Sequence, residues 1–288
     1  MKTPLIALLV LSSLFSCNST SSDQTVDSEL ITFQEKDKEI LKQVFDLYAT
    51  ENEASISDLM VKAGSFFQET PYVAHTLETG EEHLVINLRE LDCTTFAENC
   101  LAISRTIKSG SHTFERFCSE LQSIRYRDGL LDGYPSRLHY FCDWIYNNAQ
   151  MKLIADMSEE IANTPLPKPI NFMSTHPDSY GQLKESAALV DLIAAQEKEI
   201  SAREMFYIPE TKVSEFESKL RDGDIAGITT GIDGIAIQHV VILIKKEGRI
   251  HMLHASSKAE KVVISENTLE EYLLSNKSAS GIMLARPL

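Results

Sequence analysis

Cys93 is a candidate nucleophile because of the position that the sequence predicts for it. The run Leu91-Asp92-Cys93-Thr94-Thr95-Phe96 leads into a helical pattern that extends to about Ile107. A thiol in the first turn of a helix lies near the positive end of the helix dipole and near unpaired N–H groups, which lower its pKa. We therefore expect Cys93 to be reactive and interpret the remaining cysteines of the folded part as core residues, with any disulfide among them left open: Cys100, Cys118 and Cys142.

A nucleophilic thiol needs a base, and three histidines near the C-terminus are candidates. His239 begins an apolar run, and His251 and His254 follow in the next β-rich segment. These segments, residues 235–244 and 249–255, are joined by Lys245-Lys246-Glu247-Gly248, which predicts a hairpin with a glycine turn.

The length of the turn decides which histidine shares a face with His239. A two-residue turn at Glu247-Gly248 places His254 opposite Val241, and because side chains alternate, His254 then lies on the face of His239. A four-residue loop with the same centre gives the same result, whereas a three-residue loop shifts the register and selects His251. The favoured triad has Cys93 as nucleophile, His239 as general base and His254 as the group that orients the imidazole.

The elements that must position this triad are predicted in a simple order. Helical spacing of apolar residues over 35–48 and 57–67 indicates two opening helices, followed by a short strand at 84–88 and the Cys93 helix. Residues 114–162 are mostly helical in pattern, with a turn-prone interruption at 128–135, and another helix is predicted over 186–199. Helices first and an antiparallel sheet later indicate an α+β domain.

Composition narrows the function classes. The chain has 288 residues, 43% hydrophobic and 24% charged, which is typical of a globular protein with a sizeable core. It carries 27 basic and 42 acidic residues, a net charge of −15, and such a surface repels phosphate backbones. We therefore expect no nucleic-acid partner.

The first residues predict export. Met1 and Lys2 precede an apolar run over 4–16 that suits a secretory signal and is too short to span a bilayer. The run ends in Leu14-Phe15-Ser16-Cys17, which resembles a bacterial lipobox, so residues 1–17 are the expected signal and Cys17 the expected lipidation site; the alternative is a plain signal peptide. Residues 18–33 are predicted to be a flexible tether to one domain over 34–288. We expect a periplasm-facing lipoprotein that meets the membrane only through its anchor.

The catalytic candidates resemble the NlpC/p60 superfamily of bacterial cell-wall cysteine peptidases. Its pattern of Asp-Cys, His-Val and His-Ala-Ser is matched by Asp92-Cys93, His239-Val240 and His254-Ala255-Ser256, and its upstream Pro-Tyr by Pro71-Tyr72. The resemblance implies a papain-like core, in which the cysteine helix packs on the antiparallel sheet that bears the histidines. It also implies a large helical insertion over about residues 110–215.

Further motifs resemble one branch, the N-acetylmuramoyl-L-alanine amidases: Thr76-Leu77-Glu78, Glu98-Asn99 and Ser136-Arg137-Leu138-His139-Tyr140-Phe141. This resemblance implies hydrolysis of the amide between the lactyl group of N-acetylmuramic acid and L-alanine, in peptidoglycan or in muropeptides that include 1,6-anhydro forms. Cys93 would attack the carbonyl, Tyr72 would stabilise the oxyanion and His239 would protonate the amine, with no metal or other cofactor. Val241 departs from the glycine usual in the superfamily, which affects substrate fit more than chemistry.

Four residues are candidate substrate contacts: Asp92, Ser136, Arg137 and Tyr140. Arginine can bind a peptide carboxylate with two hydrogen bonds, and tyrosine can pack on a sugar face. Arg137 could equally be a structural ion-pair partner and Tyr140 a core residue.

Two other functions stay open at this point. The same fold could cut the γ-D-glutamyl bond to the diamino acid of the stem peptide, although the length of the helical insertion favours a larger pocket than a minimal peptidase needs. Alternatively, the chain could be a lipoprotein that binds muropeptides without cutting them, against which the intact triad argues. Oligomeric state is not indicated by the sequence.

Overall fold

The computed structural model describes residues 26–78 and 80–288, and it forms a mixed helix and sheet structure that confirms the α+β prediction. The opening helices and the cysteine helix lie where the sequence predicted them. The helices are α1 (Glu35–Leu47), α2 (Ile56–Phe66), α3 (Cys93–Lys108), α4 (Phe114–Arg125), α5 (Phe141–Gln150), α6 (Ser158–Ala162), α7 (Phe172–Thr175), α8 (Gly181–Lys184), α9 (Ala187–Ser201), α10 (Val213–Phe216) and α11 (Leu269–Ser275).

Most strands belong to one sheet with the order β4-β5-β10-β6-β7-β8-β9, and β3 also pairs with β10. All pairings within this sheet are antiparallel, whereas the separate pair of β1 and β2 is parallel. The strands are β1 (Ile31–Thr32), β2 (Leu84–Val85), β3 (Ile154–Asp156), β4 (Thr164–Pro165), β5 (Phe206–Pro209), β6 (Ile225–Thr230), β7 (Ile237–Lys246), β8 (Arg249–Ser256), β9 (Lys261–Ile264) and β10 (Ala279–Pro287).

The β7–β8 hairpin has the predicted register. Lys246 pairs with Arg249 across the two-residue turn, and Ile244 pairs with His251. Glu247 and Gly248 both have positive φ, 54° and 82°, as a tight hairpin turn of this kind requires. The register therefore places His254 on the face of His239 and His251 on the other face.

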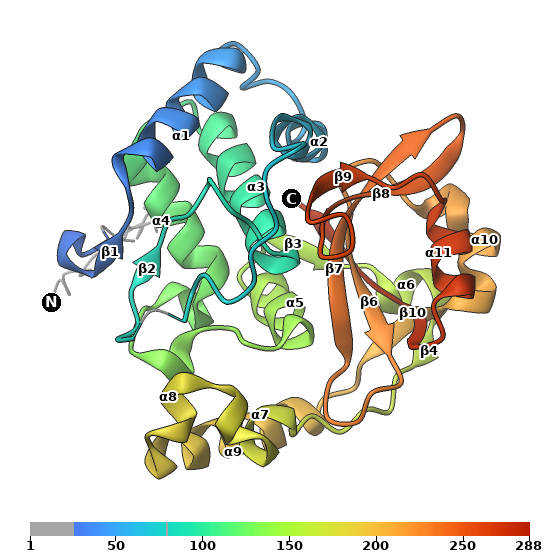
Figure 1. The fold of residues 1–288 in the computed structure, drawn as a ribbon. Helices are drawn as coiled ribbons and strands as arrows, with labels where there is room; N and C mark the ends of the chain where they lie inside the picture. The colour runs from blue at the N-terminus through green and yellow to red at the C-terminus, as the bar shows by residue number, and fades with distance from the viewer. Residues whose placement is uncertain (1–25, 79) are drawn as a thin grey trace, which may run out of the picture.

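The sheet separates two hydrophobic cores, because both of its faces are covered by helices (Figure 1). Helices α2 and α3 contact β7 and β8 on one face, where Val240 and Ile242 are buried. Helices α6 and α11 cover the other face, where Val241 and Leu243 are buried. The alternation of buried side chains along β7 thus fixes the strand between two layers, and with it the position of His239.

Helix α2 is held close to the start of β6 by a glycine. Gly223 has φ of +79°, and a Cβ at this position would lie 2.2 Å from the backbone oxygen of Ser57. Only glycine permits both this conformation and this approach, so the backbone of α2 docks directly against the chain that leads into β6.

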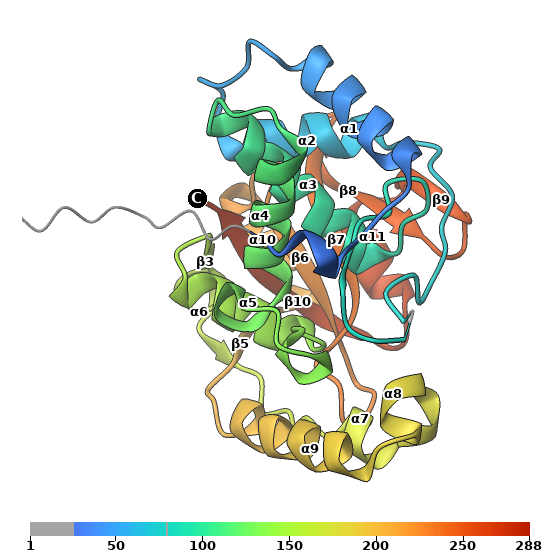
Figure 2. The same cartoon turned by 90° about the vertical axis from the view of Figure 1, so that its left-hand side faces the viewer.

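The middle of the chain is less helical than predicted. Within residues 114–162, residues 154–156 do not continue a helix. They form the short strand β3, which pairs with β10. Helices α7, α8 and α9 form a group beyond the loop between β6 and β7 (Figures 1 and 2). The backbone N–H groups of Asn171 and Phe172 donate to the Gly234 carbonyl and attach this group to the loop.

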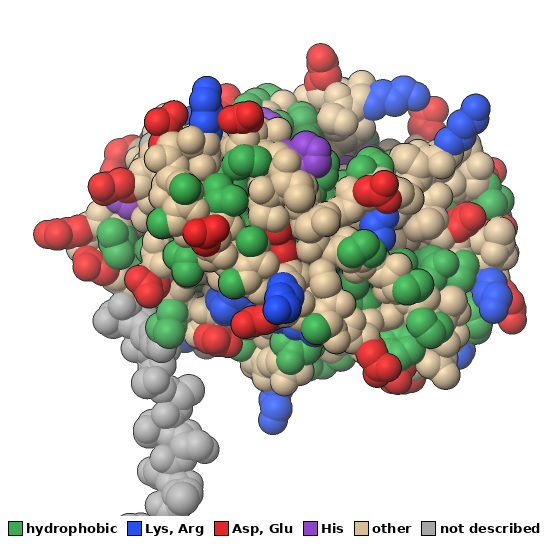
Figure 3. Space-filling view, turned by 90° about the horizontal axis from the view of Figure 1, so that it is seen from below, with side chains coloured by type: hydrophobic (Ala, Val, Ile, Leu, Met, Phe, Trp, Pro, Cys, Tyr) green, Lys and Arg blue, Asp and Glu red, His purple; other side chains and the backbone are tan. Residues whose placement is uncertain are grey.

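Acidic side chains are spread over the end of the molecule that carries α7, α8 and α9 (Figure 3), in keeping with the net charge of −15.

The N-terminal predictions are met only in part. The signal and Cys17 lie outside the described residues. Within the stretch assigned to the tether, residues 28–32 instead form a 3-10 turn and strand β1, because Ile31 and Phe33 pack against the core and Ile31 pairs with Leu84. The strand expected over 84–88 is limited to β2, although residues 84–86 and 88 are buried. Within the described part of the chain, no helix combines the length and apolar character needed to cross a bilayer.

Candidate active site

Cys93 is the first residue of α3, as the sequence predicted. The Asp92 side chain accepts a hydrogen bond from the Thr95 N–H at 2.8 Å, and the Thr95 hydroxyl accepts one from the Asp92 N–H at 2.9 Å. This reciprocal capping fixes the first turn of the helix and therefore the direction of the Cys93 side chain. Cys93 as a residue is half-buried, whereas Cys100, Cys118 and Cys142 are fully buried, and all four are free cysteines.

His239 and His254 contact each other as the hairpin register requires. His239 Nε2 lies 2.7 Å from His254 Nδ1, and the rings meet edge to face at 74°. His251 lies on the opposite face, where its Nδ1 is 3.0 Å from the Ser265 carbonyl oxygen. With Nε2 engaged by His254, the Nδ1 atom of His239 is left for another partner.

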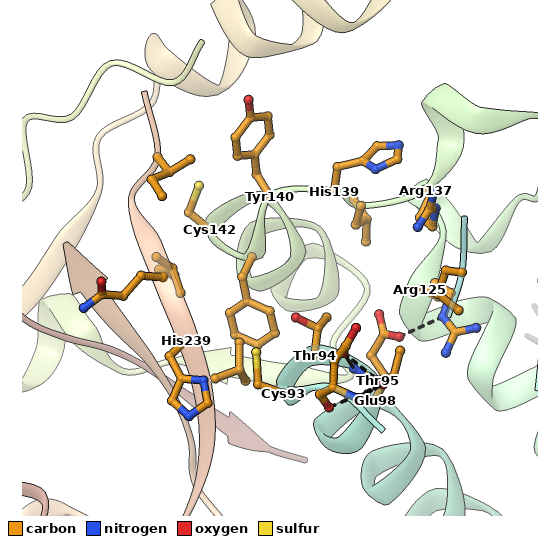
Figure 4. Close-up of a pocket in the computed structure, with 18 of the residues that line it drawn as sticks. Cys93, Thr94, Thr95, Glu98, Arg125, Arg137, His139, Tyr140, Cys142 and His239 are labelled. Atoms are coloured by element: carbon orange, nitrogen blue, oxygen red, sulfur yellow. Dashed lines mark hydrogen bonds and ion pairs between the residues drawn. The ribbon is translucent and has the colours of Figure 1, made fainter. Parts of the chain in front are cut away.

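Cys93 and His239 line one cavity of about 260 Å³ between α3, α5 and β7. Figure 4 shows the His239 ring beside the Cys93 side chain, with Tyr140, Arg137 and the Glu98–Arg125 pair around the same space. The backbone of Val240, the residue that follows His239, lowers the pKa of the thiol and so partly opposes the effect of burial. Cys93 and His239 thus border the same cavity, and no hydrogen bond joins the thiol to the His239 ring within the described residues.

The charge state of the pair differs from the sequence prediction. Burial raises the pKa of the Cys93 thiol to about 11, and the Asp92 carboxylate adds to this rise. Burial lowers the pKa of His239 to about 3, with a further contribution from His254, and lowers the pKa of His254 to about 4. The expected lowering of the thiol pKa was therefore wrong, because desolvation outweighs the helix N-terminus. At neutral pH the thiol and both imidazoles are uncharged.

Tyr72 lies near the thiol on a different segment. Its backbone bridges to Leu91, immediately before the helix cap, and Tyr72 does not line the cavity. Burial raises the pKa of the Tyr72 hydroxyl, and the neighbouring Cys93 and Asp92 raise it further. The hydroxyl is therefore protonated at neutral pH and able to donate a hydrogen bond.

Arg137 is buried on the cavity wall between two carboxylates. Its Nη2 atom is 2.6 Å from Glu78 Oε1, and its Nε atom is 3.1 Å from Glu82 Oε1. Since the guanidinium already has two carboxylate partners, its contacts match the interpretation of Arg137 as a structural ion-pair partner and not as a substrate contact.

Tyr140 and Ser136 also have partners within the protein. The Tyr140 hydroxyl donates to Glu197 of α9 at 2.5 Å and accepts the Met173 N–H at 2.8 Å, so it connects α7 and α9 to the start of α5 while its side chain lines the cavity. The Ser136 hydroxyl donates to the Gly133 carbonyl and does not line the cavity. These contacts position the cavity wall.

The sequence assigned no role to a second buried ion pair beside the thiol. Arg125 Nε lies 2.7 Å from Glu98 Oε2, and both side chains are at most 3% exposed. Arg125 also donates to the Val85 carbonyl of β2 at 2.7 Å. Glu98 belongs to the motif after the cysteine, but its partner is 27 residues away, and no spacing rule connects the two. Among the described residues, no group of three or more His, Cys, Asp or Glu side chains is arranged to hold a metal ion.

An α+β domain whose cavity is lined by a thiol, a histidine and paired charges, with a second histidine in contact with the first, has side chains that suit a hydrolase. Comparison with known families supports this class. The chain belongs to the AmiA-like, N-acetylmuramoyl-L-alanine amidase-like family, whose model matches residues 62–282. This membership supports a role as a cell-wall amidase that acts on peptidoglycan-related substrates outside the cytoplasm.

Solved structures agree with the family. An N-acetylmuramoyl-L-alanine amidase from Bacteroides uniformis is 38% identical, covers 81% of this chain and 98% of its own, and has a TM-score of 0.78. A Bacteroides fragilis protein provisionally described as a xylanase is 39% identical over 78% of this chain and 99% of its own, with a TM-score of 0.76. A Legionella pneumophila protein at 20% identity shares the fold over 87% of this chain and 95% of its own, with a TM-score of 0.64. No curated protein matches the chain.

Proposed function

We propose that this protein is an N-acetylmuramoyl-L-alanine amidase with Cys93 as nucleophile, His239 as general base and His254 as its orienting partner. The observation that supports it most strongly is the 2.7 Å contact from His239 Nε2 to His254 Nδ1, since His239 also lines the cavity of Cys93. In the tautomer we propose, His239 carries its proton on Nε2 and donates it to His254 Nδ1, which leaves His239 Nδ1 as the acceptor for the thiol proton.

The reaction proceeds in two halves. The Cys93 sulfur attacks the lactyl carbonyl carbon while its proton moves to His239 Nδ1, and the tetrahedral intermediate then loses the alanine nitrogen, which takes that proton. The saccharide remains on Cys93 as a thioester. Water attacks the thioester carbon, gives a proton to His239 and releases the lactyl carboxylic acid, and the proton returns to the thiol.

The resting charge state sets how the first step begins. Since burial disfavours a lone thiolate and a lone imidazolium, neither forms well by itself. Proton transfer from Cys93 to His239 creates both charges side by side, where they stabilise each other. The nucleophile is therefore generated as the substrate is attacked.

The oxyanion is stabilised by groups close to Cys93. The backbone N–H of Cys93 is one of the first N–H groups of α3, which have no carbonyl partner within the helix. The Tyr72 hydroxyl, held protonated, is the second proposed donor. Asp92 fixes the helix cap that aims the first donor, and Arg137 and Tyr140 hold the cavity wall against which the substrate lies.

Glycoside hydrolysis, suggested by the description of one structural relative, is less compatible with this cavity. Such enzymes use two carboxyl groups as acid and as base or nucleophile. Here Glu78 is paired with Arg137, Glu98 with Arg125, and Asp92 caps α3. The carboxylates of the cavity are therefore engaged, whereas the thiol and histidines are available.

We further propose that this domain has a papain-like NlpC/p60 core with a helical insertion over about residues 110–215. In support, α3 packs on the sheet that carries both histidines.

We also propose export through the N-terminal signal and anchoring through a lipidated Cys17, on the basis of the lipobox-like sequence. Radiolabelled palmitate incorporation that is lost in Cys17→Ala would support the anchor, and equal labelling of both proteins would exclude it.

Mass spectrometry of cleaved muropeptides tests the proposed activity. Reducing and 1,6-anhydro forms are incubated with the protein, with Cys93→Ala and with Cys118→Ala as a control for loss of a buried thiol. The proposal predicts free saccharide and an intact stem peptide from the wild type and Cys118→Ala only. Release of a saccharide that still carries L-Ala-D-Glu would instead identify the endopeptidase, and binding without cleavage would identify a binding protein.

A further inference from the structure

A second cavity, of about 800 Å³, opens on the other side of the histidine pair. His239 and His254 both line it, together with the β8–β9 turn and α11, whereas Cys93 does not. His239 therefore separates two spaces: the smaller one holds the thiol, and the larger one is bounded by the imidazoles. A substrate whose reacting bond lies between Cys93 and His239 can extend into both.

The chemistry of amide cleavage assigns one half of the substrate to each space. The acyl half becomes bonded to the Cys93 sulfur and stays in the thiol cavity until water releases it. The amine half receives its proton from His239 and therefore lies beside the imidazole when the bond breaks. The larger cavity lies on that side, so it is the space available to the leaving amine and whatever it carries.

Gln238 offers unused hydrogen-bond donors at the boundary between the two spaces. Gln238 lines both cavities, and its Oε1 atom accepts a 2.8 Å hydrogen bond from the Ser278 hydroxyl. The backbone N–H of Ser278 donates in turn to Asn276 Oδ1 at 3.2 Å, which holds Ser278 in place. The Gln238 Nε2 group is buried and has no partner among the described residues. A buried donor without a partner is costly, and a carbonyl or carboxylate of a ligand would satisfy it.

The charged groups also distinguish the two cavities. Both arginines of the thiol cavity are paired with carboxylates, as described above. Lys258 on the larger cavity is exposed, and no ion pair is formed by it within the described part of the chain. Glu266 lies on the same cavity and adds one negative charge. The larger cavity thus offers a free cation, a free anion and an amide donor, whereas the thiol cavity suits an uncharged, hydroxyl-rich group.

We propose that the larger cavity binds the stem-peptide half of the substrate, while the saccharide half occupies the thiol cavity. Lys258 binds a carboxylate of the peptide, Gln238 donates to its backbone near the cleaved bond, and Glu266 faces the ammonium group of the diamino acid. This assignment rests on the proposed amidase activity, because it uses the two halves of that reaction.

The test combines peptide binding with kinetics. Binding of the free peptide L-Ala-γ-D-Glu-meso-diaminopimelate and of N-acetylmuramic acid is measured by calorimetry for the wild type, Lys258→Glu and Gln238→Glu. Lys246→Glu, at the tip of the β7–β8 hairpin, is the matched control, since it makes the same charge change away from both cavities. We expect Lys258→Glu to weaken peptide binding about tenfold and leave saccharide binding unchanged, with no effect of Lys246→Glu.

Kinetics then separate this inference from the proposed function. For a muropeptide with the full stem, Lys258→Glu lowers kcat/KM about tenfold, whereas for N-acetylmuramoyl-L-alanine methylamide, which has a small neutral leaving group, it has little effect. Cleavage of both substrates with equal kinetics in Lys258→Glu and the wild type would overturn the assignment while the amidase stands. If neither substrate is cleaved, the amidase fails, and loss of peptide binding in Lys258→Glu still supports the peptide site. Saccharide binding that depends on Lys258 would reverse the assignment.

Discussion

Replacing Arg125 with methionine is expected to destabilise the protein strongly, because it leaves the buried Glu98 carboxylate without its cation. The Arg125–Glu98 contact is 2.7 Å long, and the side chains are 1% and 3% exposed. Removing one partner of such a pair typically costs about 3–5 kcal/mol. For a chain of this size each kcal/mol corresponds to about 2–4 °C in Tm, so the expected fall is about 6–20 °C.

The loss should depend on pH in a definite direction. Burial already raises the pKa of Glu98, and Arg125 opposes that rise. Without Arg125 the folded-state pKa rises further above the unfolded value of about 4.3, so the folded state holds the proton more tightly than the unfolded state. Stability is then retained at low pH and lost as the pH rises through the folded-state pKa. The Tm deficit of Arg125→Met should be larger at pH 8 than at pH 5.

Thermal unfolding followed by circular dichroism at pH 5, 6.5 and 8 measures this effect. Arg127→Met is the matched control, because Arg127 is partly exposed and its partner Asp143 keeps a second cation, Arg203. We expect the control to lose about 1 kcal/mol or less. A deficit in Arg125→Met that is no larger than in the control, or one that shrinks as the pH rises, would refute the reasoning.

Three other predictions concern the candidate site and the packing around it. His254→Ala should lower kcat about 100-fold with little change in KM, because His239 loses the partner that fixes its tautomer, and His254→Gln should recover part of the loss; equal kcat in all three proteins would contradict this. Alkylation of Cys93 by iodoacetamide, followed by peptide mass spectrometry, should accelerate about tenfold per pH unit from pH 7 to 10, as a thiol with a pKa of about 11 requires; a plateau at neutral pH would instead show a resting ion pair. Gly223→Ala should lower the free energy of unfolding by more than about 2 kcal/mol in urea titrations, because its Cβ meets the Ser57 backbone, and an unchanged midpoint would show that the loop relaxes.

The sequence predicted those parts of the fold that depend on the pattern of residues close together in the chain. Helical spacing located α1, α2 and α3, and the capping residues of Asp92-Cys93 located the start of α3. The two-residue turn at Glu247-Gly248 determined the hairpin register and, through strand alternation, selected His254 over His251. Each of these depends on residues close together in the chain.

The parts that sequence did not predict depend on contacts between distant segments. The order of the sheet, with β10 between β5 and β6, joins strands that are at least 49 residues apart in the chain. The Arg125–Glu98 pair has no sequence signature, and the pKa of Cys93 depends on how deeply the folded chain buries the thiol. Burial is a property of the whole structure, so the helix position alone gave the wrong direction for the pKa.

Partition of the reaction between water and hydroxylamine tests the central claim, a thioester between Cys93 and the lactyl acyl group. Hydroxylamine attacks a thioester and yields a hydroxamic acid in place of the carboxylic acid. The account predicts that the saccharide product carries a lactyl hydroxamate in proportion to the hydroxylamine concentration, that the stem peptide is released intact, and that Cys93→Ala yields neither product. Continued cleavage that gives only the free acid at every hydroxylamine concentration, or cleavage by Cys93→Ala, would contradict it.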